Sequence, residues 1–92
     1  MNNVRVRLII AGVVQGVWFR ESTRRHAQSL GIAGWVRNCS DGTVEIVAEG
    51  PLDQVKKLIQ WCNHGPPAAK VDRVQVIEES WRGEFDVFYI SR

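Results

Sequence analysis

Two hydrophobic periods follow one another along this sequence in an order that few small folds can accommodate. Apolar residues occupy every second position in segments 4–11 and 43–49, which predicts strands with one buried side. Segments 21–30 and 52–62 carry apolar residues at helical spacing and are predicted to be helices. Three further apolar segments are expected to be strands: 33–38, 71–78 and 85–90. The predicted order is therefore β-α-β-β-α-β with an additional C-terminal strand.

Glycine and proline mark the expected ends of these elements. Gly12 is expected to end the first strand and Gly31 to stop the first helix. Asp41-Gly42 predicts a hairpin turn between the second and third strands. Since proline suits the first turn of a helix, the second helix is expected to begin at Gly50-Pro51, and it ends at Gly65-Pro66-Pro67.

Two β-α-β halves joined by a hairpin predict an α+β sandwich of the ferredoxin-like type, a split β-α-β fold. Both helices are expected on one face of an antiparallel sheet, with the short last strand at an edge. The chain has 92 residues, enough for one core, so we expect a single domain over residues 1–92. With 45% apolar and 24% charged residues it has a globular composition. No apolar run approaches the ~20 residues that span a bilayer, so we expect a cytoplasmic protein without a membrane segment.

The cysteine and tryptophan content adds two further expectations. Cys39 and Cys62 are too few for a disulfide framework and lack the spacing of a structural zinc site. We expect two reduced thiols, and a single bridge between them is the alternative that the sequence leaves open. Of the four tryptophans, most are expected in the core, and Trp18 is expected to form a wall of the loop described next.

Positive charge gathers in the first part of the chain. Residues 1–40 contain six arginines and one acid, whereas acids outnumber bases in residues 41–92. Within the first part, segment 12–20 (Gly-Val-Val-Gln-Gly-Val-Trp-Phe-Arg) joins a predicted strand to a predicted helix. A helix start offers unpaired N–H groups, a glycine-bearing loop lets them converge, and the Arg20 guanidinium can bind phosphoryl oxygens as a fork. The local pattern fits either a small-anion site or a tight turn followed by an ordinary surface arginine.

Asn38 lies at the end of a predicted strand, directly before the hairpin. Its side chain both donates and accepts hydrogen bonds, so it can hold a water molecule in a fixed orientation. Asparagine is also common in turns, where it satisfies nearby backbone groups, and from the residue alone this is the simpler interpretation.

Two segments of the chain together resemble the acylphosphatase family. Segment 10–20 (Ile-Ala-Gly-Val-Val-Gln-Gly-Val-Trp-Phe-Arg) resembles the first signature of that family at every constrained position. Segment 34–38 (Gly-Trp-Val-Arg-Asn) resembles the second signature, together with three later positions: Gly42, Val44 and Gly50. The resemblance spans about residues 4–90, and the fold of the family is ferredoxin-like, in agreement with the predicted order of elements.

This resemblance implies a hydrolase that cleaves acyl phosphates, the mixed anhydrides of a carboxylic acid and phosphate, to carboxylate and inorganic phosphate. It implies that Arg20 and backbone N–H groups of the loop bind the phosphoryl group, and that Asn38 positions the attacking water. The phosphate-binding residues expected on this basis are Gln15, Gly16, Val17, Trp18, Phe19 and Arg20. It also implies catalysis without a metal, a cofactor or a covalent phosphoenzyme. We further expect a monomer that binds neither nucleic acid nor membrane.

The residues agree with this chemistry. Phosphoryl transfer needs positioning and charge stabilisation more than covalent chemistry. The leaving carboxylate requires no strong general acid, and an oxygen of the substrate's own phosphate can accept the proton of the water. Glu21 lies beside the loop, where an anion would repel the substrate, so we expect this carboxylate to act as a favourable charge at the helix start and to turn to solvent.

Other phosphatase mechanisms and other functions agree less well with the sequence than hydrolysis of acyl phosphates does. Neither Cys39 nor Cys62 has an arginine at the Cys-x5-Arg spacing of cysteine-dependent phosphatases. His26 and His64 are expected on helix surfaces rather than as phosphate acceptors. An RNA-binding module on this fold would stack bases on aromatic residues of its central strands, and segment 43–47 has none. A sensor that binds anions without hydrolysing them is the second functional class left open.

Overall fold

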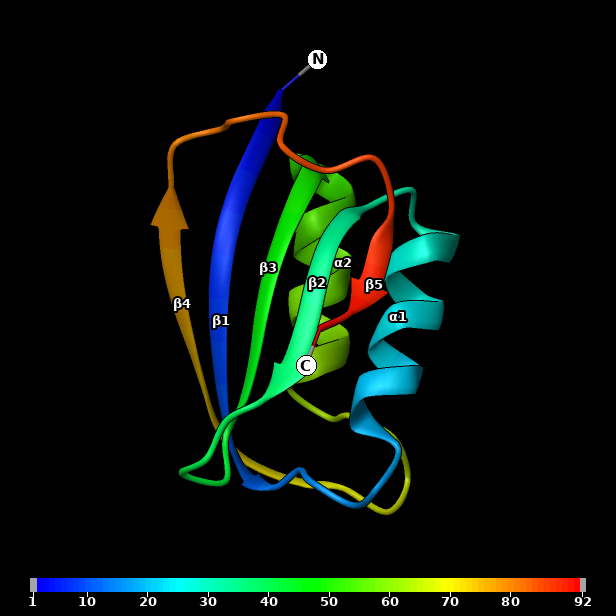
Figure 1. Cartoon of the computed structure of the whole chain (residues 1–92), viewed down its shortest axis with the longest axis vertical. Helices are drawn as coiled ribbons and strands as arrows, with labels where there is room; N and C mark the ends of the chain where they lie inside the picture. The colour runs from blue at the N-terminus through cyan, green and yellow to red at the C-terminus, as the bar shows by residue number, and fades with distance from the viewer. Residues whose placement is uncertain (1, 92) are drawn as a thin grey trace.

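The computed structural model describes residues 2–91 of the chain. Its elements, in chain order, are β1 (Asn3–Val13), α1 (Phe19–Ser29), β2 (Ala33–Asn38), β3 (Val44–Pro51), α2 (Leu52–Cys62), β4 (Lys70–Glu79) and β5 (Phe88–Ile90) (Figure 1). The predicted order of elements is confirmed. Across residues 2–91 no helix is long and apolar enough to cross a membrane.

The strands form one mixed sheet in the order β4-β1-β3-β2-β5. β1 pairs antiparallel with β3 and β4, and β2 pairs antiparallel with β3. β5 occupies the edge next to β2, as predicted, and runs parallel to it. Segment 80–87 reverses the chain after β4, and β2 also runs opposite to β4, so β5 and β2 share a direction.

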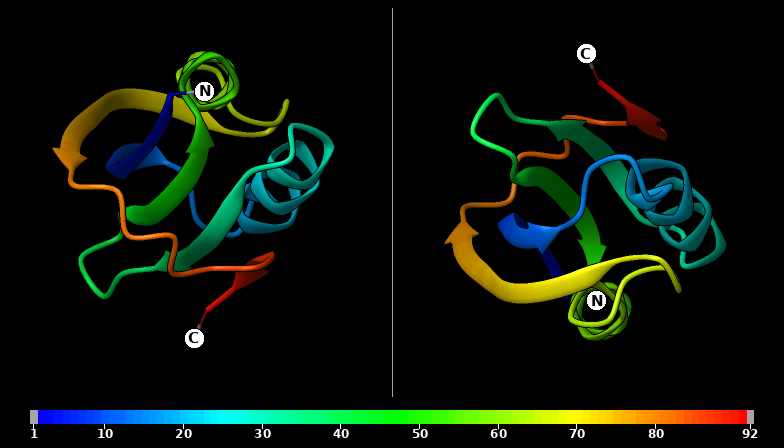
Figure 2. Two further views of the ribbon diagram at one scale, coloured as in Figure 1. Left: turned by 90° about the horizontal axis from the view of Figure 1, so that it is seen from above. Right: turned by 90° about the horizontal axis from the view of Figure 1, so that it is seen from below.

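Both helices cover one face of the sheet, and segment 80–87 crosses the other face (Figure 2). The core lies between the sheet and the helices, because alternate residues of the central strands point to that side. Among its fully buried side chains are Leu8 and Ile10 of β1, Val44 and Ile46 of β3, and Leu58 of α2. The ferredoxin-like sandwich predicted from the sequence is thereby confirmed.

Gly12 does not end β1, contrary to our prediction. The strand continues to Val13 through an irregularity between Ala11 and Gly12 in its pairing with β4. Gly12 has a φ of 129°, and a Cβ atom there would lie 2.2 Å from the carbonyl oxygen of Lys70. The glycine therefore permits a bulge, which bends the strand and leaves the pairing intact beyond it.

The prediction that most tryptophans lie in the core is wrong. Trp18 is 79% exposed and Trp81 is 47% exposed. Trp61 is half-buried and covers the outside of the core, where its ring centroid lies 5.5 Å from that of Phe19. Phe19, Phe88 and branched aliphatic residues fill the space between sheet and helices, and the indole rings lie at its margin or outside it. Cys39 and Cys62 are unpaired, as expected.

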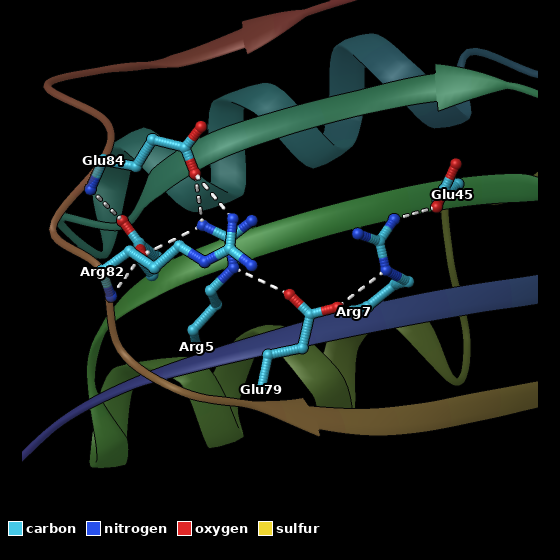
Figure 3. A network of polar contacts seen from close by, with 7 residues as sticks. Arg5, Arg7, Glu45, Glu79, Arg82 and Glu84 are labelled. Atoms are coloured by element: carbon cyan, nitrogen blue, oxygen red, sulfur yellow. Dashed lines mark hydrogen bonds and ion pairs between the residues drawn. The ribbon is translucent and has the colours of Figure 1, made fainter.

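The open face of the sheet carries a network of ion pairs beneath segment 80–87 (Figure 3). Arg5 is buried there, and its guanidinium donates to Glu79 at 2.8 Å, to Glu84 at 2.8 Å and to Glu49 at 3.2 Å. Glu49 is 1% exposed and also accepts hydrogen bonds from two backbone N–H groups of the crossing segment. The network therefore fastens segment 80–87, and with it β5, onto the sheet.

These contacts lower the pKa values of two carboxyl groups. Hydrogen bonds from Arg5 and then Arg7 lower the pKa of Glu79. Burial alone would raise the pKa of Glu49, but the backbone N–H of Glu84 and the guanidinium of Arg5 outweigh it and lower this pKa too. Ionised carboxylates therefore stabilise the fold above the pKa of unfolded glutamate, about 4.3, and this contribution is lost as the pH falls through the lower folded values.

We expect Arg5→Met to lower the free energy of unfolding by about 3 kcal/mol at neutral pH, because it leaves the buried Glu49 carboxylate without its cation. Urea denaturation measures this change. The difference from wild type should shrink at strongly acid pH, where the carboxyl groups are protonated in both proteins. Arg25→Met is the control, because Arg25 is 76% exposed and its ion pair contributes little. Equal urea midpoints for Arg5→Met and wild type would show that the network does not stabilise the fold.

Candidate active site

The loop between β1 and α1 is held in the core at both ends. Val14 is 1% exposed and Phe19 is 2% exposed, so the two residues fix where the intervening backbone runs. Between them the chain bends through left-handed conformations at Gly16, with a φ of 75°, and at Trp18, with a φ of 67°. The loop is consequently a short, tightly bent segment whose ends cannot move apart.

The backbone N–H groups of this loop remain available to a ligand. Within the described part of the chain, those of residues 15–18 donate to no backbone or side-chain acceptor. The first N–H groups of α1 lack partners within the helix, and the side chain of Trp18, the N-cap residue, does not cap them. Unpaired donors at a helix N-terminus favour an anion, both by hydrogen bonding and through the helix dipole.

A cleft of about 500 Å³ opens beside this loop. The loop, the start of α1, the end of β2 and the end of β5 surround it, and Figure 1 shows the loop and the end of β2 at the same end of the sheet. Its lining residues are Val14, Gly16, Trp18, Phe19, Arg20, Glu21, Asn38 and Ile90. Five of the predicted site residues thus border one cleft, whereas Gln15 and Val17 do not line it.

Arg20 lies in the first turn of α1, as predicted, and is exposed at the cleft. Among residues 2–91 it has no carboxylate within ion-pair distance. Six other arginines of the described chain do pair with glutamates: Arg5, Arg7, Arg24, Arg25, Arg37 and Arg82. The guanidinium beside the loop therefore keeps its donors and its charge for an anion.

Asn38 brings an amide to the cleft from the end of β2. Its backbone is fixed by the pairing of β2 with β3, where it lies opposite Val44. Its Oδ1 atom is buried and has no hydrogen-bond partner among the described residues. Buried polar atoms without partners are rare in folded proteins, and one beside a cleft is consistent with a group kept for a ligand or a water molecule.

The side chain of Gln15 has a role that our sequence analysis missed. Its Nε2 atom donates to the carbonyl oxygens of Cys39 at 2.8 Å and Thr43 at 2.9 Å. The Cys39 N–H also donates to the Thr43 carbonyl, so these two residues close the hairpin that follows Asn38. Gln15 therefore ties the loop to the end of β2, and the spacing of the two segments in the sequence gives no sign of this contact.

Glu21 borders the cleft, whereas we predicted that it turns to solvent. Its carboxylate accepts hydrogen bonds from Arg24 at 2.9 Å and from Arg25 at 3.1 Å. The contact with Arg24, and then that with Arg25, lowers the pKa of Glu21 to about 2. A carboxylate with so low a pKa is a weak proton acceptor. Its two cationic neighbours offset its repulsion of an anion in the cleft.

Among the described residues, the remaining titratable groups offer no alternative metal or catalytic centre. Residues 2–91 contain no group of three or more His, Cys, Asp or Glu side chains that could hold a metal ion. His26 and His64 are exposed, and the His26 ring lies against Trp61 with 4.3 Å between centroids. Both histidines are therefore surface residues, as expected.

Comparisons with known proteins identify the family of this chain. The family model Acylphosphatase matches residues 6–90. An acylphosphatase of Pelotomaculum thermopropionicum is 50% identical over 91 residues, which are 99% of each chain. One of Acaryochloris marina is 56% identical over 91 residues, 99% of this chain and 97% of the other. The crystal structure of acylphosphatase from Bacillus subtilis matches with a TM-score of 0.93 and 36% identity, over 97% of this chain and 99% of that chain.

Proposed function

The chain belongs to the acylphosphatase family, and from this premise we propose that it hydrolyses acyl phosphates to a carboxylate and inorganic phosphate. One observation carries the proposal. A single cleft is lined by Arg20 and Asn38. Among residues 2–91, Arg20 has no carboxylate partner, and the amide oxygen of Asn38 accepts no hydrogen bond. These are the two groups that a phosphoryl site and a water site require.

The phosphoryl group binds at the start of α1. The N–H groups of residues 15–18 and of the first helical turn surround its oxygens, and Arg20 binds two of them as a fork. These donors are in place before substrate arrives, because Val14 and Phe19 anchor the loop in the core. Charge that develops on the phosphoryl oxygens in the transition state is thereby stabilised without rearrangement.

Asn38 positions the water that attacks phosphorus. The water oxygen forms a bond to phosphorus while the bond from phosphorus to the acyl oxygen breaks, and that bonding pair leaves with the carboxylate. The proton of the water passes to an oxygen of the phosphoryl group. Gln15 supports this arrangement at a distance, because its hydrogen bonds to Cys39 and Thr43 hold the loop against the strand end that carries Asn38.

The proposal extends to how the enzyme works as a whole. We expect residues 1–92 to act as one domain and as a monomer, with no metal and no cofactor, since the proposed steps use only amides, a guanidinium and water. The unpaired state of Cys39 and Cys62 supports a reducing compartment such as the cytoplasm.

The test is an assay with benzoyl phosphate as substrate and phenyl phosphate as the ester control. We expect hydrolysis of the first alone, at the same rate with and without a chelator, because only the anhydride has a leaving group that departs without an acid. In water enriched in heavy oxygen, the label should enter phosphate and not benzoate. Binding of phosphate without turnover of benzoyl phosphate would instead identify an anion sensor, and label in benzoate would place the attack at carbon.

A further inference from the structure

Trp18 has a backbone conformation that bulky residues rarely adopt. It is the only non-glycine residue of the described chain with a positive φ, 67°. A side chain in the left-handed region is unfavourable, and such residues concentrate at functional sites where the surrounding structure holds them. The loop imposes this conformation at Trp18 because the chain must turn there into α1 from the buried Val14.

Among residues 2–91, no ring or cation contact accounts for a tryptophan at this position. Its side chain is 79% exposed, the largest exposed fraction among the large hydrophobic residues of the described chain. By contrast, Trp61 packs against Phe19 and His26, and Trp35 lies beneath the guanidinium of Arg37. No such ring or cation contact involves Trp18 among residues 2–91, so its indole surface is available to a ligand.

Trp18 borders the same cleft as Arg20 and Asn38. Two aliphatic residues also line it: Val14, and Ile90 at the end of β5. The lining therefore combines a guanidinium and an amide with apolar residues, among them Trp18. An acyl phosphate has the same division, because its acyl group begins one oxygen away from the phosphoryl group.

We infer that Trp18 determines substrate specificity, by stacking on the acyl group, and that the preferred substrates carry a planar, apolar acyl group such as an aromatic ring. This inference rests on the proposed function. A flat acyl group covers the indole face and gains the stacking energy of an aromatic pair, whereas an acetyl group is too small to do so. Ile90 packs against the edge of the acyl group.

The experiment compares kcat/KM for benzoyl phosphate and for acetyl phosphate in wild type, Trp18→Gly and Trp18→Phe. We expect Trp18→Gly to lower the ratio of kcat/KM for benzoyl phosphate to kcat/KM for acetyl phosphate about fivefold to tenfold. The ratio is the readout because the loop N–H groups bind the phosphoryl group of both substrates, so any effect of glycine on these donors applies to both. Trp18→Phe should retain most of the preference. Inhibition by inorganic phosphate measures any effect on the loop N–H groups separately, because phosphate has no acyl group to stack.

Folding does not obscure this result, since glycine adopts the left-handed conformation of Trp18 without strain. Trp81→Gly is the matched control, because Trp81 is also exposed and does not line the cleft, and it should leave both substrates unaffected. An equal loss for both substrates in Trp18→Gly, or no loss for either, would overturn the inference while leaving the proposed function intact. Failure of the wild-type protein to hydrolyse either substrate would overturn the proposed function as well.

Discussion

Replacing Arg20 with lysine is expected to lower kcat/KM for benzoyl phosphate at least about a thousandfold, the loss seen when an arginine that stabilises a phosphoryl transition state is removed. Lysine keeps the positive charge but presents a single ammonium group in place of the planar fork. It therefore cannot bind two phosphoryl oxygens while the loop N–H groups bind the others. Steady-state kinetics measure the change.

Arg25→Lys is the matched control, since Arg25 lies on the same helix and is 76% exposed, and it should retain the activity of wild type. The urea midpoints of both variants should equal that of wild type, because Arg20 has no ion pair within residues 2–91 whose loss could destabilise the fold. Activity of Arg20→Lys close to that of wild type would remove Arg20 from the mechanism.

The charge distribution of the sequence illustrates what composition alone can predict. The excess of arginine in residues 1–40 indicated a positive surface that could attract an anion. In the folded protein most of that charge is paired: Arg5 and Arg7 bind glutamates of β3 and β4, and Arg24 and Arg25 bind Glu21. Arg20 differs in having no carboxylate partner among residues 2–91, and only the tertiary structure reveals this.

Periodicity predicted the strands and helices because the core requires apolar residues on one side of each element. It did not correctly predict the end of a strand where a glycine permits a bulge. A glycine that ends a strand and one that permits a bulge are identical in sequence, and the choice at Gly12 depends on the distance to Lys70 of another strand. Similarly, Glu45 and Glu49 are buried on the open face by cross-strand arginines and by segment 80–87, which local patterns do not contain.

In the candidate site, too, local sequence patterns indicate the contiguous residues and miss the contacts between distant segments. The loop and Arg20 are contiguous, so helix-start chemistry already suggests an anion site there, beside the alternative of a tight turn followed by a surface arginine. Asn38 is on another strand, and the residues by themselves favoured an ordinary turn until the resemblance to the family joined the two segments. For Gln15 the resemblance implies phosphate binding by a backbone N–H and says nothing of the side chain, whose amide donates to the carbonyls of Cys39 and Thr43. Which way a loop side chain points is decided by acceptors far along the chain.

Replacing Asn38 with alanine is expected to lower kcat for benzoyl phosphate about a hundredfold, the usual loss when a single orienting hydrogen-bond group is removed from a hydrolytic site. KM should change less than about threefold, because the phosphoryl group is bound by Arg20 and the loop and not by the amide. Stability should be retained, since Oδ1 of Asn38 accepts no hydrogen bond within the described chain.

Whether the loss in Asn38→Ala falls on kcat or on KM distinguishes a water-positioning residue from a phosphate-binding one. A water-positioning residue acts after substrate has bound, so its removal slows the chemical step and leaves inhibition by inorganic phosphate unchanged. A phosphate-binding residue would produce the opposite result, a raised KM with weaker inhibition and a kcat close to that of wild type. Asn63→Ala is the control, because Asn63 is exposed at the end of α2, outside the cleft, and its amide donates to the Ile59 carbonyl. If Asn38→Ala shows only the raised KM, the attacking water must be oriented by another group, and the phosphoryl oxygens themselves become the strongest candidate.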